Sequence, residues 1–257
     1  MVALGLTLVA SAAEATVIGT STDVFQPDRS EISFTGLSLG TVDPIYSAPP
    51  GHPDAPTVSF GSYFTGQSLG TAASCGGDYC LDGSPLSDLS LVDASLNALT
   101  FVTTEIQAPD NPVLSGYPTP LRPISILFSQ DQAGVGVSVG PALASGAERL
   151  TAFDRNGDIL ASILNDTVGY SFLTLASDDA SAAIAGVQIT STGATTGGFA
   201  LDTVLFGGPS QVAVPAPGNL SLFALALALI VFARLRSTRR GGLRGRARAG
   251  VEASIVC

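Results

Sequence analysis

LTAFDRNGDILAS, residues 150–162, places a turn signal between two short apolar segments. Asn156-Gly157 is the strongest short hairpin signal in proteins, because a two-residue turn needs positive φ at both positions and Asn and Gly tolerate it best. We therefore predict a β-hairpin made of residues 147–154 and 158–165, joined by a two-residue turn. This stretch is the clearest indication of fold class in the chain.

The same pattern of short apolar segments and turn residues continues on both sides of this hairpin. The candidate strands are 31–39, 57–64, 96–106, 123–129, 134–140, 147–154, 158–165, 168–176, 183–190 and 198–207. No segment shows a sustained helical period, so the pattern predicts one all-β sandwich or barrel. Two proline-rich segments, Pro44–Pro56 and 107–123, are expected to be loops.

Alternation within the later strands predicts which side chains share a face. Tyr170 and Phe172 are expected on one face of their strand. Asp202 is expected on the same face as Val204 and Phe206 of the last strand.

Composition indicates a packed domain, since 46% of the 257 residues are hydrophobic and only 12% are charged. The net charge of −10 is unevenly distributed. Residues 16–213 contain 4 Arg against 19 Asp and Glu, a net charge of −15, whereas residues 234–257 contain 7 Arg and 1 Glu. An acidic body repels phosphates, so we expect no nucleic-acid partner.

The first 15 residues, MVALGLTLVASAAEA, are an apolar run that ends in small residues. Ala13-x-Ala15 fits the small-x-small cleavage pattern of secretory signals. We expect 1–15 to be a signal peptide truncated at its start, which directs the chain to the Sec translocon. The alternative is a buried first strand or helix.

Near the other end, residues 218–233 are almost entirely apolar and are followed by Arg234, Arg236, Arg239 and Arg240. Sixteen residues span about 24 Å as a helix, which is short for a bilayer core of about 30 Å, and flanking arginines can extend the span. The positive-inside rule places these arginines in the cytoplasm and the acidic body outside. We therefore expect one transmembrane helix at about 218–233.

This ending resembles the PEP-CTERM sorting signal of Gram-negative bacteria. The likeness rests on Val214-Pro215-Ala216-Pro217, the apolar segment and the arginine cluster, within residues 213–240. It implies recognition by an exosortase-type membrane protease, and then release to the cell surface or medium in association with exopolysaccharide or biofilm. The chain departs from the pattern in having Ala216 where Glu is usual, and in a basic cytoplasmic extension, 241–257.

The body, residues 16–212, is similar to ectodomains often carried by such sorted proteins. The likeness rests on residues 111–129, 133–140, 150–162, 169–179 and 197–207. It implies a jelly-roll-like β-sandwich of the general shape of carbohydrate-binding modules and lectins.

Cys75 and Cys80 enclose GGDY, a loop short enough for a disulfide. Export to an oxidising compartment favours that bond over a redox pair, and a zinc site would need more ligands than these two and the single His52. Cys257 is expected to stay unpaired.

Calcium is the cofactor that the sequence raises. Asp154, Asn156 and Asp158 alternate as oxygen ligands do in calcium loops, although hairpin chemistry explains the same three residues better. Asp178, Asp179 and Asp202 are further candidate ligands. A carboxylate on a buried face needs a partner, which for Asp202 is either a metal ion or one of Arg122, Arg149 and Arg155.

Catalytic motifs are sparse: the body has one His, no Lys and no nucleophile elbow. We therefore expect a non-enzymatic, exported β-sandwich associated with polysaccharide. Two alternatives stay open, namely a secreted glycan hydrolase that uses paired carboxylates and a structural matrix protein that associates with itself.

Overall fold

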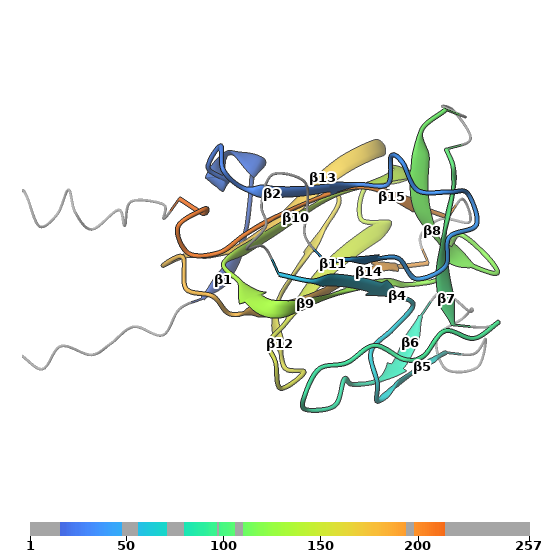
Figure 1. Ribbon diagram of the computed structural model, residues 1–257, viewed down its shortest axis with the longest axis horizontal. Coiled ribbons are helices and arrows are strands. Elements are labelled where there is room, and N and C mark those ends of the chain that lie inside the picture. Colours follow the sequence, from blue (N-terminus) through green and yellow to red (C-terminus); the bar gives the residue numbers. More distant parts are fainter. Residues whose placement is uncertain are drawn as a thin grey trace, which may run out of the picture. The chain divides into compact units, whose positions relative to one another are not determined.

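The computed structural model describes residues 16–47, 56–70, 80–96, 98–105, 110–193 and 198–213. Apart from one 3-10 turn, Thr22–Val24, its regular elements are strands (Figure 1), which confirms the all-β prediction. The strands are β1 (Val17–Thr20), β2 (Ser30–Ser33), β3 (Ile45–Tyr46), β4 (Val58–Gly61), β5 (Gln67–Leu69), β6 (Leu81–Gly83), β7 (Leu99–Thr104), β8 (Pro112–Tyr117), β9 (Ile124–Gln132), β10 (Gly134–Ala142), β11 (Glu148–Phe153), β12 (Ile159–Leu164), β13 (Gly169–Ser177), β14 (Ile184–Ser191) and β15 (Ala200–Gly207).

Two antiparallel sheets form a sandwich. The first sheet has the order β1-β13-β10-β15-β8-β7, with β2 also paired to β15. The second sheet has the order β12-β11-β14-β9-β4-β3. The small β5–β6 hairpin is separate from both. From β9 onward the chain repeatedly crosses from one sheet to the other, so each sheet is completed by strands that are distant in sequence.

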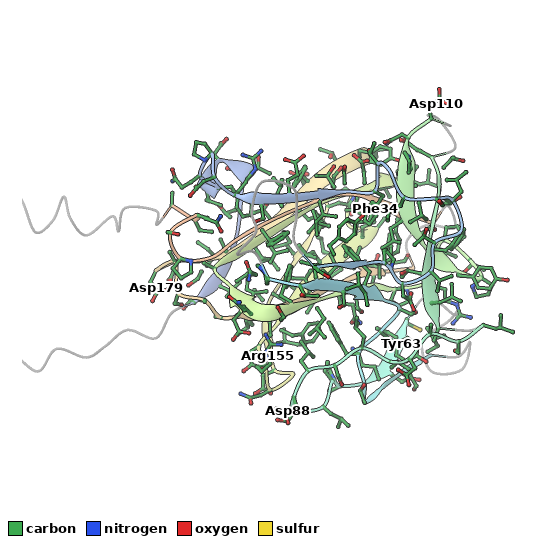
Figure 2. All side chains as sticks on the ribbon, in the orientation of Figure 1. Phe34, Tyr63, Asp88, Asp110, Arg155 and Asp179 are labelled. Atoms are coloured by element: carbon green, nitrogen blue, oxygen red, sulfur yellow. The ribbon has the colours of Figure 1, made fainter. Side chains whose placement is uncertain are left out.

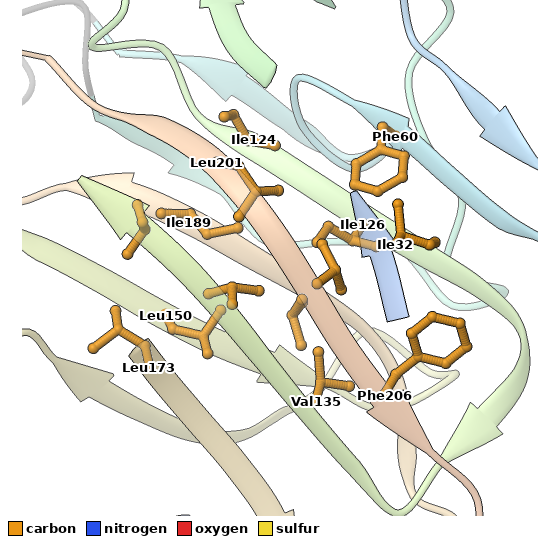
Figure 3. Close-up of a cluster of buried hydrophobic side chains, with 14 of the residues drawn as sticks. Ile32, Phe60, Ile124, Ile126, Val135, Leu150, Leu173, Ile189, Leu201 and Phe206 are labelled. Atoms are coloured by element: carbon orange, nitrogen blue, oxygen red, sulfur yellow. The ribbon is translucent and has the colours of Figure 1, made fainter. Parts of the chain in front are cut away.

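The core lies between the two sheets and is built from alternate residues of each strand (Figure 3). The first sheet contributes Val135, Leu173, Leu201 and Phe206 among others, and the second sheet contributes Ile126, Leu150 and Ile189 among others. Side chains of intervening residues therefore point to the outer faces. Those outer faces, rather than the core, are available for binding.

The β11–β12 hairpin is confirmed, with Ala152 opposite Ala161. The expected two-residue turn is wrong, because residues 154–158 form a longer loop and only Gly157 of the Asn-Gly pair has positive φ, at 85°. The Asp154 carboxylate accepts hydrogen bonds from the backbone N–H groups of Asn156 and Asp158, at 2.9 and 2.8 Å, and so closes the longer loop.

Both predicted loops are wrong in part, because β3 lies inside Pro44–Pro56 and β8 lies inside 107–123. Pro112 is the first residue of β8, a position where a missing N–H does little harm, and Pro118 comes directly after its last residue. The prolines therefore delimit the strand rather than exclude it.

The predicted face of Asp202 is also wrong. Ser138 lies opposite Thr203 and Val139 lies opposite Leu201, so Asp202 is the extra residue of a β-bulge. Leu201 and Val204 both point into the core, whereas Asp202 is only half-buried and points away from it. Alternation fails here because the bulge shifts the register by one residue.

Candidate functional site

Two aromatic side chains are exposed on the outer face of the first sheet. Tyr170 and Phe172 are 37% and 42% exposed, whereas Leu173 between the sheets is buried. They occupy alternate positions of β13, so their rings lie on the same face, as predicted. Exposed neighbouring rings on a flat sheet face are a common feature of surfaces that bind other molecules.

The strand beside β13 leaves room for the Phe172 ring. A Cβ atom at Gly136 of β10 would lie 3.2 Å from Phe172 Cε1 and 3.1 Å from Thr174 Oγ1. A larger residue at Gly136 would therefore push the ring off the sheet. Next to the ring is a hollow of about 480 Å³ lined by Thr22, Asp23, Phe25, Arg29, Phe172 and Leu205.

Tyr170 lines a second and smaller cavity, of about 240 Å³, on the same outer face. Strands β7 and β8, at one end of the molecule in Figure 1, supply much of its wall. The lining is mainly apolar, with Glu105 and Ser115 among its polar members, and includes Phe101, Val113, Pro118, Pro120, Pro141 and Phe199. Pockets for drug-sized ligands measure about 300–1,000 Å³, so this cavity matches a single small ring.

Two carboxylates meet beside this cavity. Asn111 Nδ2 donates to Glu105 Oε2 at 3.3 Å and to Asp202 Oδ1 at 3.1 Å. The hydroxyl of Thr203 donates to Asp202 Oδ2 at 3.2 Å. The hydrogen-bond partners of Asp202 thus include the Asn111 amide and the Thr203 hydroxyl. The β-bulge directs the Asp202 side chain away from the core. Arg155, one of the arginines considered for it, pairs with Asp131 instead.

Tyr170 stays protonated beside these acids. Burial raises its pKa, and a hydrogen bond to Glu105 and the neighbouring negative charges of Glu105, Asp202 and Glu148 raise it further. The phenol therefore keeps its proton at neutral pH and donates it to Glu105. The cavity rim thus offers an aromatic face beside a cluster of hydrogen-bond acceptors.

The six candidate calcium ligands lie in three separate places. Asp154, Asn156 and Asp158 belong to the β11–β12 loop, where Asp154 already accepts backbone hydrogen bonds and one from Asn156 Nδ2. Among the residues described, no three His, Cys, Asp or Glu side chains are grouped closely enough to hold a metal ion.

Asp178 and Asp179 follow β13 at the end of the molecule opposite Asp110 (Figure 2). Asp178 Oδ1 accepts a hydrogen bond from the backbone N–H of Thr16, at 3.0 Å. Asp179 accepts hydrogen bonds from the Ser177 hydroxyl and the Ser181 N–H, which lower its pKa. Asp179 thus organises the turn after β13, and Asp178 ties that turn to the residue before β1.

Cys80 is disulfide-bonded, while its expected partner Cys75 lies outside the described residues. The signal segment 1–15, Val214–Pro217, the span at 218–233, the arginine cluster and Cys257 also lie outside them. Within the described ranges, no helix is long and apolar enough to cross a membrane.

No protein-family model matches this chain, and no curated protein is significantly similar to it.

Sequence reasoning identified the shared face of Tyr170 and Phe172 but missed Glu105 and Asn111. The last two are separated from Asp202 by more than 90 residues in sequence and meet it only because β8 pairs with β15. No local pattern indicates that pairing, so no local signal could have assembled the group.

Proposed function

We propose that this chain is an exported protein, sorted through a PEP-CTERM-like signal, whose jelly-roll-like sandwich binds glycan on the outer face of its first sheet. The observation that carries the binding proposal is the exposed pair Tyr170 and Phe172 on one face of β13. We infer no catalytic step for this activity.

The chemistry of the face fits a sugar better than other ligands. A pyranose ring has an apolar face that stacks on aromatic side chains and hydroxyl groups that need both donors and acceptors. Tyr170 and Phe172 supply the stacking surfaces. Glu105 and Asp202 supply acceptors, and the Tyr170 hydroxyl, which donates to Glu105, can still accept through its oxygen. Alternate residues of a strand are about 6.7 Å apart, which lets successive units of an extended chain contact successive rings.

The charge of the body supports a neutral glycan. Residues 16–213 have a net charge of −15, which disfavours nucleic acids and other polyanions. An exported, exosortase-processed protein would encounter exopolysaccharide at the cell surface or in the surrounding matrix. Exosortase and the Sec translocon are the processing partners in this proposal.

Isothermal titration of the sandwich, residues 16–213, with cellohexaose, laminarihexaose and mannohexaose tests this proposal. We expect at least one to bind, and Tyr170→Ala or Phe172→Ala to weaken that binding by about tenfold, equivalent to about 1.4 kcal/mol. Leu96→Ala is the matched control, because Leu96 is an exposed apolar side chain in a loop and lines neither the cavity at Tyr170 nor the hollow at Phe172. Unchanged affinity in both aromatic variants would contradict the proposed site.

A glycan hydrolase is the second candidate, favoured by one observation. Asn111 holds the Glu105 and Asp202 carboxylates near one another beside the cavity, and paired carboxylates are the machinery of glycoside hydrolysis.

Reducing-sugar release from the same oligosaccharides separates the two candidates. A hydrolase would turn them over and lose at least about 100-fold of its rate in Glu105→Gln. A binding module would show no release in the parent protein, and Glu105→Gln would only lower its affinity.

A further inference from the structure

A row of polar side chains crosses the outer face of the second sheet. Ser162, Thr151, Gln188 and Ser125 lie opposite one another on β12, β11, β14 and β9. Thr151 Oγ1 and Ser162 Oγ are 2.9 Å apart, and Gln188 Nε2 donates to Ser125 Oγ at 2.8 Å. Although they lie on an outer face, Gln188 and Thr151 are only 3% and 9% exposed, because the chain folds back over them.

The β5–β6 hairpin is attached to this row. Gln67 and Gln188 exchange hydrogen bonds, with Gln188 Nε2 donating to Gln67 Oε1 at 2.9 Å and Gln67 Nε2 donating to Gln188 Oε1 at 3.2 Å. The Phe64 N–H also donates to Gln67 Oε1, at 2.9 Å. These polar contacts hold the hairpin against the sheet beside a buried apolar cluster that includes Phe64, Leu89, Phe153 and Ala185.

A groove of about 520 Å³ results, which we call the second-sheet groove. Arg149, Thr151, Gln188 and Thr190 line it from the sheet; the β5–β6 hairpin and the β11–β12 loop also contribute, including Leu81, Asp158 and Ile159. This volume is within the range of about 300–1,000 Å³ that is typical of ligand pockets.

The groove presents both donors and acceptors. Arg149 lies opposite Thr190 across the β11–β14 pair and has no ion-pair partner among the described side chains. Its guanidinium offers several N–H donors, and the exposed Asp158 carboxylate offers acceptors. Ile159, which is 67% exposed, adds an apolar surface at the rim. Opposite charges, hydroxyls and an apolar rim together suit a neutral, polyhydroxylated ligand.

We propose that the second-sheet groove is a second saccharide-binding site, so that one sandwich bridges two glycan chains. The choice of ligand class rests on the proposed function of the first sheet, but the groove itself is a separate site. The aromatic face and the groove lie on the outer faces of different sheets, with the core between them. Two sites facing away from each other cannot serve one short oligosaccharide, but they can cross-link a matrix.

Titration of residues 16–213 with the same three hexasaccharides tests this inference through stoichiometry. We expect two sites per chain in the parent protein and one in either Arg149→Ala/Thr190→Val or Tyr170→Ala/Phe172→Ala. The groove variant should weaken its own site by about tenfold or more, because a charged hydrogen-bond donor is lost. Leu96→Ala is the control, because Leu96 is exposed and lines neither the groove nor the cavities of the first sheet, and it should keep both sites.

The outcomes distinguish the two proposals. If the parent protein has a single site and only Tyr170→Ala/Phe172→Ala removes it, the groove proposal is overturned and the proposed function still holds. If the parent protein has a single site and only Arg149→Ala/Thr190→Val removes it, the proposal for the aromatic face is overturned and the groove proposal is supported. Absence of binding to all three sugars contradicts both. Amide chemical shifts of Thr151, Gln188 and Thr190 report groove occupancy directly, including in the Tyr170→Ala/Phe172→Ala background.

Discussion

Glu148 is a buried acid at the start of β11. It is 2% exposed, and neither of its carboxylate oxygens has a hydrogen-bond partner in the described part of the chain. Burial raises its pKa from 4.5 to about 7. The native state therefore holds this proton more tightly than the unfolded state, and the stability of the fold falls as the pH rises from about 4.5 to about 7.

Glu148→Gln removes the charge that causes this loss. We expect the variant to be more stable than the parent at pH 8, by up to about 3 kcal/mol from the size of the pKa shift, and similar to it near pH 4. Urea unfolding at both pH values measures the difference. A difference in the free energy of unfolding that is the same at both pH values would contradict the raised pKa of Glu148.

Gly157 is required in the β11–β12 loop for two independent reasons. Its φ is 85°, and a Cβ atom there would lie 2.9 Å from the Pro85 carbonyl oxygen and 3.0 Å from that of Leu86. We expect Gly157→Ala to cost about 2 kcal/mol or more, and to lower the Tm by about 4–8 °C.

Gly146→Ala is the matched control, because Gly146 has a φ of 76° but open space around its Cα. Its free energy of unfolding should fall only by the cost of placing an alanine at positive φ, about 1–2 kcal/mol. Equal losses in the two variants, measured by thermal unfolding, would show that the contact with residues 85 and 86 is unimportant.

Asn165 ties the end of β12 to the start of β11. Its side chain accepts a hydrogen bond from the Glu148 N–H at 2.9 Å and donates to the carbonyls of Ala144 and Thr167, both at 2.8 Å. Asn165→Ala removes all three hydrogen bonds and leaves the buried Glu148 N–H without its partner, so we expect a loss of about 3 kcal/mol. The exposed neighbour variant Asp166→Ala should change the free energy of unfolding by less than about 0.5 kcal/mol. Comparable losses in both would mean that Asn165 has no special role.

Local sequence patterns predicted the strands that carry apolar alternation, because a side-chain period of two is visible within one segment. They missed β1, β3, β5 and β6, which are short, and β8, whose prolines resemble loop residues. They also gave Asp202 the wrong face, because the bulge depends on how β15 pairs with β10. Properties set by strand pairing are not encoded in any single segment.

The candidate site shows the same division. The aromatic face was predictable from the spacing of Tyr170 and Phe172, whereas the Glu105–Asn111–Asp202 group forms only through the β7–β8–β15 pairings. Of the two carboxylates that sequence spacing brought together, Asp154 accepts the backbone hydrogen bonds that close the turn, and Asp158 donates one of them through its backbone N–H.

At the scale of the whole molecule, an acidic body is followed in sequence by a basic C-terminal segment. We expect the mature protein, isolated from the surface or medium of its own cells, to begin at Thr16, to lack the arginine-rich end and to contain oxidised Cys75 and Cys80. Intact-mass analysis of the cell fractions measures all three features at once. A full-length chain with reduced cysteines in the cytosol would contradict the export proposal.

The central claim is that glycan binds across the outer face of the first sheet. NMR chemical-shift mapping of the isotope-labelled sandwich, titrated with whichever hexasaccharide binds most tightly, tests it most directly. The account predicts that the largest shifts include the amides of Gly136, Ser138, Tyr170, Phe172 and Thr203 on β10, β13 and β15. Shifts that avoid these strands, or the absence of shifts with every oligosaccharide, would contradict it.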